Sequence, residues 1–180
     1  MVFEQFARLA GELLPSGAEA ALELGAGNWT LLSAPAFARA RRVALNLRFD
    51  ATPSAQLLEC EMVVGNANRI PFADASFDCV LSSSALEHDK YFWRTIAEVR
   101  RVLRKGGVFI VGVPIYKTLP TDKDFTTVTY ARHGIAYNAD YFRFSEQAVR
   151  ELFFEDYACV THEILVREYP NPYLVAAGRK

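Results

Sequence analysis

The chain has 180 residues, of which 51% are hydrophobic, and its formal net charge at pH 7 is −1. This length suits a single domain, and the hydrophobic share is enough to fill the core of a layered fold. The near-neutral charge supplies no electrostatic footprint for a phosphate backbone, which argues against nucleic acid as a partner.

The three cysteines, Cys60, Cys79 and Cys159, lie far apart in the sequence. An odd count at these spacings suits neither a disulfide framework nor a metal site, so we expect no metal. Glu4 and Arg8 interrupt the first apolar segment, which argues against a signal peptide. The other apolar runs are too short to span a membrane. We therefore expect a soluble, cytoplasmic protein.

The first predicted element is a helix. Phe3, Phe6, Ala10 and Leu13 recur at spacings of three and four, which is the pattern of an amphipathic helix, and Pro15 would end it.

Short apolar runs and helical stretches then alternate along the chain. We expect strands at 20–25, 43–46, 61–65, 77–82 and 108–111. The helices predicted between them run from about 29 to 40, weakly from 54 to 58, and from 92 to 105 before Gly106-Gly107. Strands that alternate with helices pair in parallel through right-handed crossovers. The sequence therefore predicts an open α/β sheet with helices on both faces.

The last part of the chain follows another pattern. Ser145 is placed to cap a helix that runs to Phe154. Two strands at 159–167 and 173–177, joined by a Pro-Asn-Pro turn, are expected to form an antiparallel hairpin at a sheet edge. The residues from 115 to 138 show no clear period, and a segment of that length inside a compact domain usually has a function.

The first strand ends in the turn Glu23-Leu24-Gly25-Ala26-Gly27. In an open α/β sheet, ligands bind beyond the carboxyl ends of the strands, and glycine lets the backbone turn sharply and approach a ligand. A tight connection without a ligand is the alternative interpretation. A dinucleotide fingerprint would need a third glycine where Thr30 stands, which argues against a nicotinamide-dependent enzyme.

Four segments carry a resemblance to a known family. They are ALELGAG at 21–27, GNANRIPF at 65–72, SFDCVLSSSALEH at 76–88 and EVRRVLRKGG at 98–107. In this order they resemble class I S-adenosylmethionine-dependent methyltransferases, and more narrowly the type 11 group. The segment 140–145 is a looser likeness.

The resemblance implies a three-layer Rossmann-like fold with a mostly parallel seven-stranded sheet and a C-terminal antiparallel strand. The single methyltransferase-like domain would comprise an N-terminal helix (1–15), a cofactor-binding core (20–114), a substrate-covering segment (115–144) and a C-terminal helix and hairpin (145–180).

The resemblance also implies roles for individual residues. Gly25, Ala26 and Gly27 would line the methionine end of S-adenosylmethionine, with Glu23 near its ammonium group. The other positions that it assigns to the site are Asn46 and Leu47 at the ribose, Asn66 and Ala67 at the adenine, and Ser83, Ser84 and His88 near the transferable methyl group.

Three residues depart from the family's pattern. Trp29 stands where a third glycine is common, and its ring would either narrow the methionine pocket or turn into the core. Asn46 and Asn66 replace acidic residues, and an amide at Asn46 gives up charge-assisted hydrogen bonding of order 1 kcal/mol. Two hypotheses follow: an active methyltransferase, or a non-catalytic binding or scaffold module with weakened cofactor binding.

His88 and His133 are the candidate general bases, because histidine suits proton transfer near neutral pH. The alternatives are a helix-start residue in solvent for His88 and an ordinary loop histidine for His133. The acceptor would be a small molecule with an oxygen or nitrogen nucleophile. Because the chain is short for the family, a second copy or another partner chain is an alternative means of closing the site.

Overall fold

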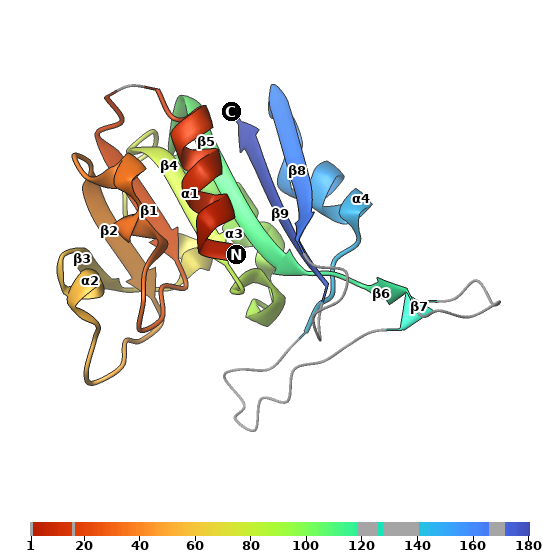
Figure 1. Cartoon of the computed structure of the whole chain (residues 1–180), viewed down its shortest axis with the longest axis horizontal. Helices are drawn as coiled ribbons and strands as arrows, with labels where there is room; N and C mark the ends of the chain where they lie inside the picture. The colour runs from red at the N-terminus through yellow and green to blue at the C-terminus, as the bar shows by residue number, and fades with distance from the viewer. Residues whose placement is uncertain (1, 16, 119–125, 128–140, 166–171) are drawn as a thin grey trace.

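The computed structural model describes residues 2–15, 17–118, 126–127, 141–165 and 172–180. A seven-stranded sheet in the order β3-β2-β1-β4-β5-β9-β8 forms its centre (Figure 1). The strands are β1 (Ala20–Leu24), β2 (Arg41–Asn46), β3 (Glu61–Val64), β4 (Phe77–Ser83), β5 (Leu103–Pro114), β8 (Cys159–Leu165) and β9 (Tyr173–Arg179). The first five pair in parallel, and β9 is antiparallel to both β5 and β8. The predicted fold class is confirmed.

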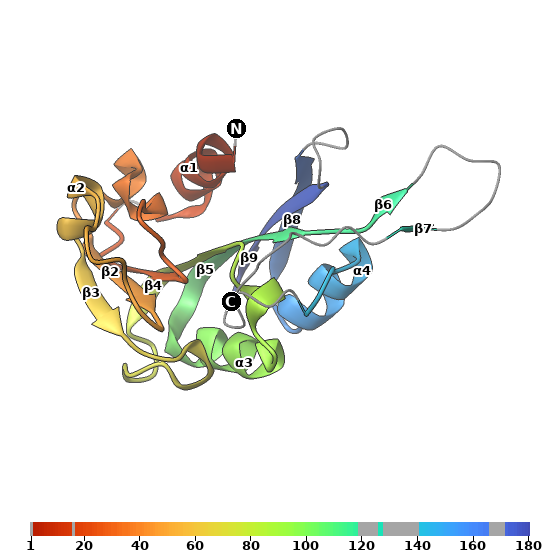
Figure 2. The same cartoon turned by 90° about the horizontal axis from the view of Figure 1, so that it is seen from below.

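Helices cover both faces of this sheet (Figure 2). On one face lie α1 (Val2–Leu13) and α2 (Ala55–Leu58). On the other lie α3 (Phe92–Val102) and α4 (Glu146–Ala148), which continues as the π-helical turn η6 (Val149–Phe153). A short ribbon of β6 (Lys117–Thr118) and β7 (Thr126–Thr127) extends away from the main sheet (Figure 1).

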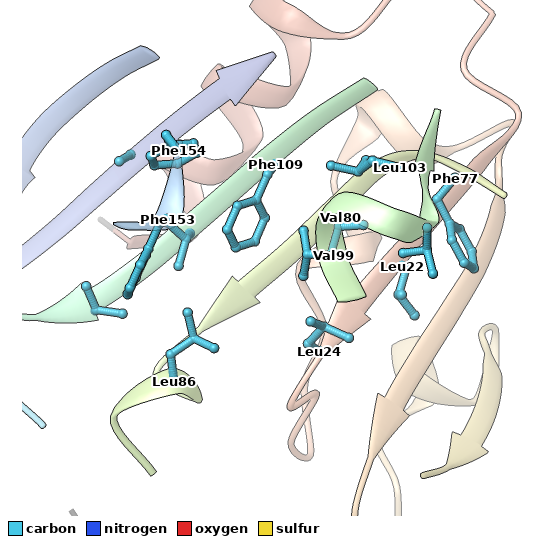
Figure 3. Packing of buried hydrophobic residues seen from close by; sticks show 14 of the residues in the cluster. Leu22, Leu24, Phe77, Val80, Leu86, Val99, Leu103, Phe109, Phe153 and Phe154 are labelled. Atoms are coloured by element: carbon cyan, nitrogen blue, oxygen red, sulfur yellow. The ribbon is translucent and has the colours of Figure 1, made fainter. Parts of the chain in front are cut away.

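Alternation along the strands divides the core into two apolar clusters, because successive side chains of a strand point to opposite faces. Leu22 and Val80 belong to the cluster under α3, where Val99 covers them (Figure 3). Ala21 and Cys79 belong to the cluster under α1. Cys79 is fully buried and is therefore a core residue.

The predicted helix from 29 to 40 is wrong. Two 3₁₀ turns replace it, η1 (Leu31–Ser33) and η2 (Pro35–Phe37), and between them Ala34 is extended with ψ 144°. Pro35 explains the break, since a residue before proline avoids the helical region and proline has no N–H to donate. The glycine turn therefore leads into short 3₁₀ turns, rather than into a long helix whose first amides face a ligand.

The predicted boundary between the helix at 92–105 and the strand that follows it is also wrong. α3 ends at Val102, and β5 begins at Leu103, which pairs with Phe77. Gly106 lies inside β5 with φ +78°, so it permits an irregular strand instead of ending the helix.

The C-terminal elements agree with the sequence. The Ser145 side chain accepts a hydrogen bond from the amide of Ala148, as a helix cap does, and β8 and β9 form the predicted hairpin at the sheet edge. Among the described residues, no helix has the length and apolar character needed to cross a bilayer. The described residues also contain no group of three histidine, cysteine, aspartate or glutamate side chains that could hold a metal ion.

Asp78 joins the beginnings of β4 and β1. Its Oδ2 accepts hydrogen bonds from the amides of Glu19 at 2.7 Å and Ala20 at 3.0 Å, and Arg104 Nη1 lies 2.9 Å from its Oδ1. Burial opposes the charge of this carboxylate, but the two amides and Arg104 outweigh it and lower the pKa of Asp78.

We expect Asp78→Ala to lower the free energy of unfolding by about 2–3 kcal/mol, because it leaves two amides and one guanidinium without their acceptor. Urea denaturation at pH 7 measures this change. The matched control is Asp74→Ala, since the Asp74 side chain is 79% exposed in its ion pair with Arg101. Asp74→Ala should lower the free energy of unfolding by less than about 1 kcal/mol. Equal losses for both variants would contradict the role of Asp78 in joining β4 to β1.

Candidate functional site

The carboxyl ends of β1, β2, β3 and β4 lie at one edge of the sheet, because these strands pair in parallel. The segments that leave the sheet there are 25–27, 46–47, 65–67 and 83–88. They carry every site residue predicted from the sequence except Glu23, which lies within β1, and His133, which is outside the described residues. The fold thus gathers most of the predicted site.

The glycine turn is held closely on one side and open on the other. Gly25 has φ +76°, its amide donates to the Leu45 carbonyl at 2.8 Å, and a Cβ on it would stand 2.6 Å from the Cβ of Ala85. A Cβ on Gly27 would meet no atom within 4 Å. Gly25 is therefore required by the fold itself, whereas Gly27 borders open space.

Asn46 connects the end of β2 to the glycine turn. Its Nδ2 donates to the carbonyl oxygen of Ala26 at 2.7 Å, and its Oδ1 accepts from the amide of Leu47 at 2.8 Å. The side chain of Leu47 is 65% exposed. Both functional groups of the Asn46 amide thus bind the main chain.

The segment assigned to the adenine begins with Asn66, whose Oδ1 accepts from the amide of Asn68 and caps the turn η3 (Ala67–Arg69). The side chain of Asn68 donates to Asp89 Oδ2 at 2.7 Å and to Thr95 Oγ1 at 2.8 Å. These contacts tie η3 to the beginning of α3.

Two charged residues of α3 hold the chain that follows η3. Glu98 accepts a hydrogen bond from the amide of Ile70 at 2.8 Å, and Arg101 donates to the carbonyls of Ile70 and Phe72. The hydrogen bond from Arg101 is the main cause that lowers the pKa of Glu98. These two charged side chains of α3 therefore hold the chain that directly follows Asn66 and Ala67.

Glu23 is 4% exposed, and its carboxylate accepts hydrogen bonds from the hydroxyl of Thr30 and from the amide of Leu31 at 2.9 Å. Burial raises the pKa of Glu23 to about 7, although these hydrogen bonds act in the opposite direction. Its contacts with protein lie in η1, and its contact with a cofactor ammonium group stays a prediction.

Tyr173 organises the turn that follows β4. Its hydroxyl lies 2.9 Å from Ser83 Oγ and 3.0 Å from Ser84 Oγ, and it accepts a hydrogen bond from the Ser84 amide at 3.0 Å. Ser84 has φ +50°, a conformation that few residues other than glycine adopt. Burial is the main cause that raises the pKa of Tyr173, so its hydroxyl stays protonated.

Sequence reasoning missed Tyr173, but a signal for it existed. An antiparallel last strand begins at the edge where the parallel strands end. The first residue of β9 therefore lies beside the end of β5, where Pro114 pairs with Tyr173, and next to the turn that follows β4.

His88 closes the short turn η4 (Leu86–His88). Its side chain is 23% exposed, and its Nε2 lies 3.9 Å from Oε1 of Glu87, which is itself buried. The main-chain carbonyl of Glu87 accepts from the amide of Tyr141 at 2.8 Å. This turn is therefore linked to the segment that leads into α4, and His88 is partly covered rather than fully in solvent.

The aromatic side chains divide between surface and core. Trp29 is 54% exposed, so the alternative in which its ring fills the core is wrong. Phe144 is buried and Phe142 packs against the same cluster, with ring centroids 5.1 Å and 5.0 Å from that of Phe92. Both rings therefore pack in the core.

A sequence profile of the methyltransferase domain family matches residues 22–111, which is half of the chain. The chain therefore belongs to this family, as the four ordered segments indicated. Its structure also resembles that of 1,6-didemethyltoxoflavin-N1-methyltransferase from Burkholderia thailandensis, determined with 1,6-didemethyltoxoflavin and S-adenosylhomocysteine bound. The TM-score is 0.76 at 19% identity, over 99% of this chain and 77% of that one.

Two relatives match parts of the sequence. An uncharacterised protein of transposon TN4556 from Streptomyces fradiae is 31% identical over 125 residues, which are 64% of this chain and 36% of that protein. The phthiotriol/phenolphthiotriol dimycocerosates methyltransferase of Mycobacterium tuberculosis is 49% identical over 49 residues, which are 27% of this chain and 18% of the enzyme. The chain thus corresponds to well under two thirds of either relative.

We expect Glu23→Gln to change how stability depends on pH. The unfolded carboxyl loses its proton near 4.5 and the folded one near 7, so folding retains the proton between these values. The unmodified protein should lose stability relative to the variant as the pH rises from about 4.5 to 7, by on the order of 3 kcal/mol. Urea titrations across this range measure the difference, and parallel curves would contradict it.

We expect Tyr173→Phe to lower the free energy of unfolding by about 1–2 kcal/mol, because it removes the hydroxyl that Ser83 and Ser84 bind. Tyr116→Phe is the control, since Tyr116 is 41% exposed, and should change stability by less than about 0.5 kcal/mol. Denaturant unfolding of both variants checks this, and a neutral Tyr173→Phe would argue against the role of the hydroxyl.

Proposed function

We propose that this chain binds S-adenosylmethionine at the edge formed by the ends of β1 to β4, and transfers the methyl group to a small-molecule acceptor. The observation that carries the proposal is the glycine turn, which is fixed by Leu45 and Ala85 on one side and open beside Gly27. The family membership supports this class of reaction, and the S-adenosylhomocysteine bound by the Burkholderia enzyme supports the cofactor.

The residues present fit such a ligand. Gly27 leaves room for close approach to the main chain, and the Asn46 amide retains one N–H and one lone pair for the ribose hydroxyls. Asn66 and Ala67 would flank the adenine. Trp29 exposes more than half of its surface, so its ring does not occupy the interior under the turn.

The cofactor supplies a methyl group already activated by a positively charged sulfur. The protein's tasks are therefore to align the acceptor, exclude water and receive a proton. Bound at this edge, the cofactor would supply its methyl carbon to an oxygen or nitrogen of the acceptor, and the electron pair of the broken carbon–sulfur bond would stay on sulfur. His88, whose Nε2 lies 3.9 Å from Oε1 of Glu87, would take the proton that the acceptor loses. A role for His133 stays a prediction.

The acceptor would be held by the turn that follows β4 and by the predicted substrate-covering segment (115–144), most of which lies outside the described residues. The proposed acceptor is a small molecule, and a second copy or another partner chain is the alternative means of closing the site. The non-catalytic hypothesis has less support, because Asn46 and Asn66 each have a defined role in ordering a turn at the edge.

The test is calorimetric titration with S-adenosylmethionine and S-adenosylhomocysteine. We expect saturable binding by the unmodified chain. Gly27→Leu should weaken it at least tenfold with little change in Tm, because the added side chain enters open space in the free protein.

Gly11→Leu is the control, since a Cβ on Gly11 in α1 also meets no atom within 4 Å, and it should bind as the unmodified chain does. The proposal fails if the unmodified chain gives neither heat nor a thermal shift at millimolar ligand. Undiminished binding by Gly27→Leu would also exclude this edge as the site.

A further inference from the structure

We infer that Asn46 is a positioning residue, which holds the glycine turn in its binding conformation by donating a hydrogen bond that a carboxylate at this position cannot donate. The effect of this hydrogen bond on cofactor binding rests on the proposed function. The hydrogen bond itself is a property of the free protein.

Two hydrogen bonds, running in opposite directions, fasten the glycine turn to the end of β2. The amide of Gly25 donates to the carbonyl of Leu45 at 2.8 Å, and Nδ2 of Asn46 donates to the carbonyl of Ala26 at 2.7 Å. The first uses only main-chain atoms, so the side chain at position 46 supplies neither its donor nor its acceptor. The second needs a donor in that side chain, and Ala26 is 1% exposed, so solvent is a poor substitute.

The orientation of the amide is fixed by a second contact. Oδ1 of Asn46 accepts from the amide of Leu47 at 2.8 Å, so Nδ2 must face Ala26. An ionised carboxylate has acceptors only. It would keep the contact with Leu47 but bring an anionic oxygen against the carbonyl oxygen of Ala26, which is repulsive.

This arrangement reverses the usual expectation for the end of the second strand. Judged by ribose contact alone, an acid should bind better than an amide, because a carboxylate accepts from both hydroxyls with charge assistance. If the glycine turn decides, aspartate at position 46 should weaken ligand binding. The residues that would line the methionine end of the ligand then lose the hydrogen bond that holds them. The two views therefore predict opposite changes in ligand affinity for the substitution Asn46→Asp.

Asn66 provides a matched comparison within the same site. Its side chain also follows a parallel strand, but within the described part of the chain its oxygen alone makes a hydrogen bond, as acceptor from the amide of Asn68 at 2.9 Å. A carboxylate can take over that role. The substitution of asparagine by aspartate should therefore loosen the chain at position 46 and preserve it at position 66.

The first measurement is calorimetric binding of S-adenosylhomocysteine to the unmodified chain, Asn46→Asp and Asn46→Ala. We expect Asn46→Asp to bind at least tenfold more weakly than the unmodified chain and no more tightly than Asn46→Ala. Equal or tighter binding by Asn46→Asp would overturn the inference, because the ribose contact would then dominate.

The second measurement is hydrogen exchange without ligand. We expect the Gly25 amide to exchange at least tenfold faster in Asn46→Asp and Asn46→Ala than in the unmodified chain, and the Asn68 amide to stay protected in Asn66→Asp. Unchanged exchange at Gly25 in both position-46 variants would overturn the inference. If Asn46→Asp does not fold, Asn46→Ala carries the test.

The two proposals can fail separately. If the unmodified chain binds no S-adenosylhomocysteine, the proposed function fails, while exchange at Gly25 still decides whether Asn46 holds the turn. If the unmodified chain binds and Asn46→Asp binds more tightly, the inference about Asn46 fails and the proposed function stands.

Discussion

The parallel register of β1 with β2 and β4 is the constraint on which the site depends. Leu24 pairs with both Leu45 and Ser82, so the glycine turn, Asn46 and Ser83 all leave the sheet at the same level. A shift by one residue would exchange the two faces of a strand and turn Glu23 from η1 toward α3. The two apolar clusters oppose such a shift, because each strand contributes alternate side chains to both of them.

The register fixes where the loops begin, and polar side chains fix where they go. η3 and the residues after it are fastened by Asn68, Glu98 and Arg101. The turn after β4 is fastened by Tyr173. These contacts link residues 21 to 90 positions apart in the sequence. The free energy that orders the edge therefore comes from the packed sheet and α3, rather than from local preferences of the loops, which suits a site that must be formed before a ligand arrives.

The sequence predicted what local patterns determine and missed what tertiary pairing determines. Alternating apolar runs predicted the parallel sheet, the spacing of Phe92, Ile96 and Val99 predicted α3, and four ordered segments predicted the family. The helix from 29 to 40 failed because Pro35 outweighs a run of residues that otherwise favours helix. Tyr173 was missed because its role exists only when β9 lies antiparallel beside β5. The sequence indicated which residues meet at the edge, but not which hydrogen bonds they make there.

The polar residues along this edge differ in burial and in charge. Glu23, the carboxylate expected at the methionine end, is buried in contact with η1, and the burial that raises its pKa favours the neutral form. Asn46, proposed for the ribose end, is neutral and fastens the glycine turn. Glu87 is buried in the turn after β4, near the Tyr173 hydroxyl, whose pKa it helps to raise after the larger effect of burial. On the proposed function, the edge would therefore position its ligand through neutral hydrogen-bonding groups rather than through fixed charges.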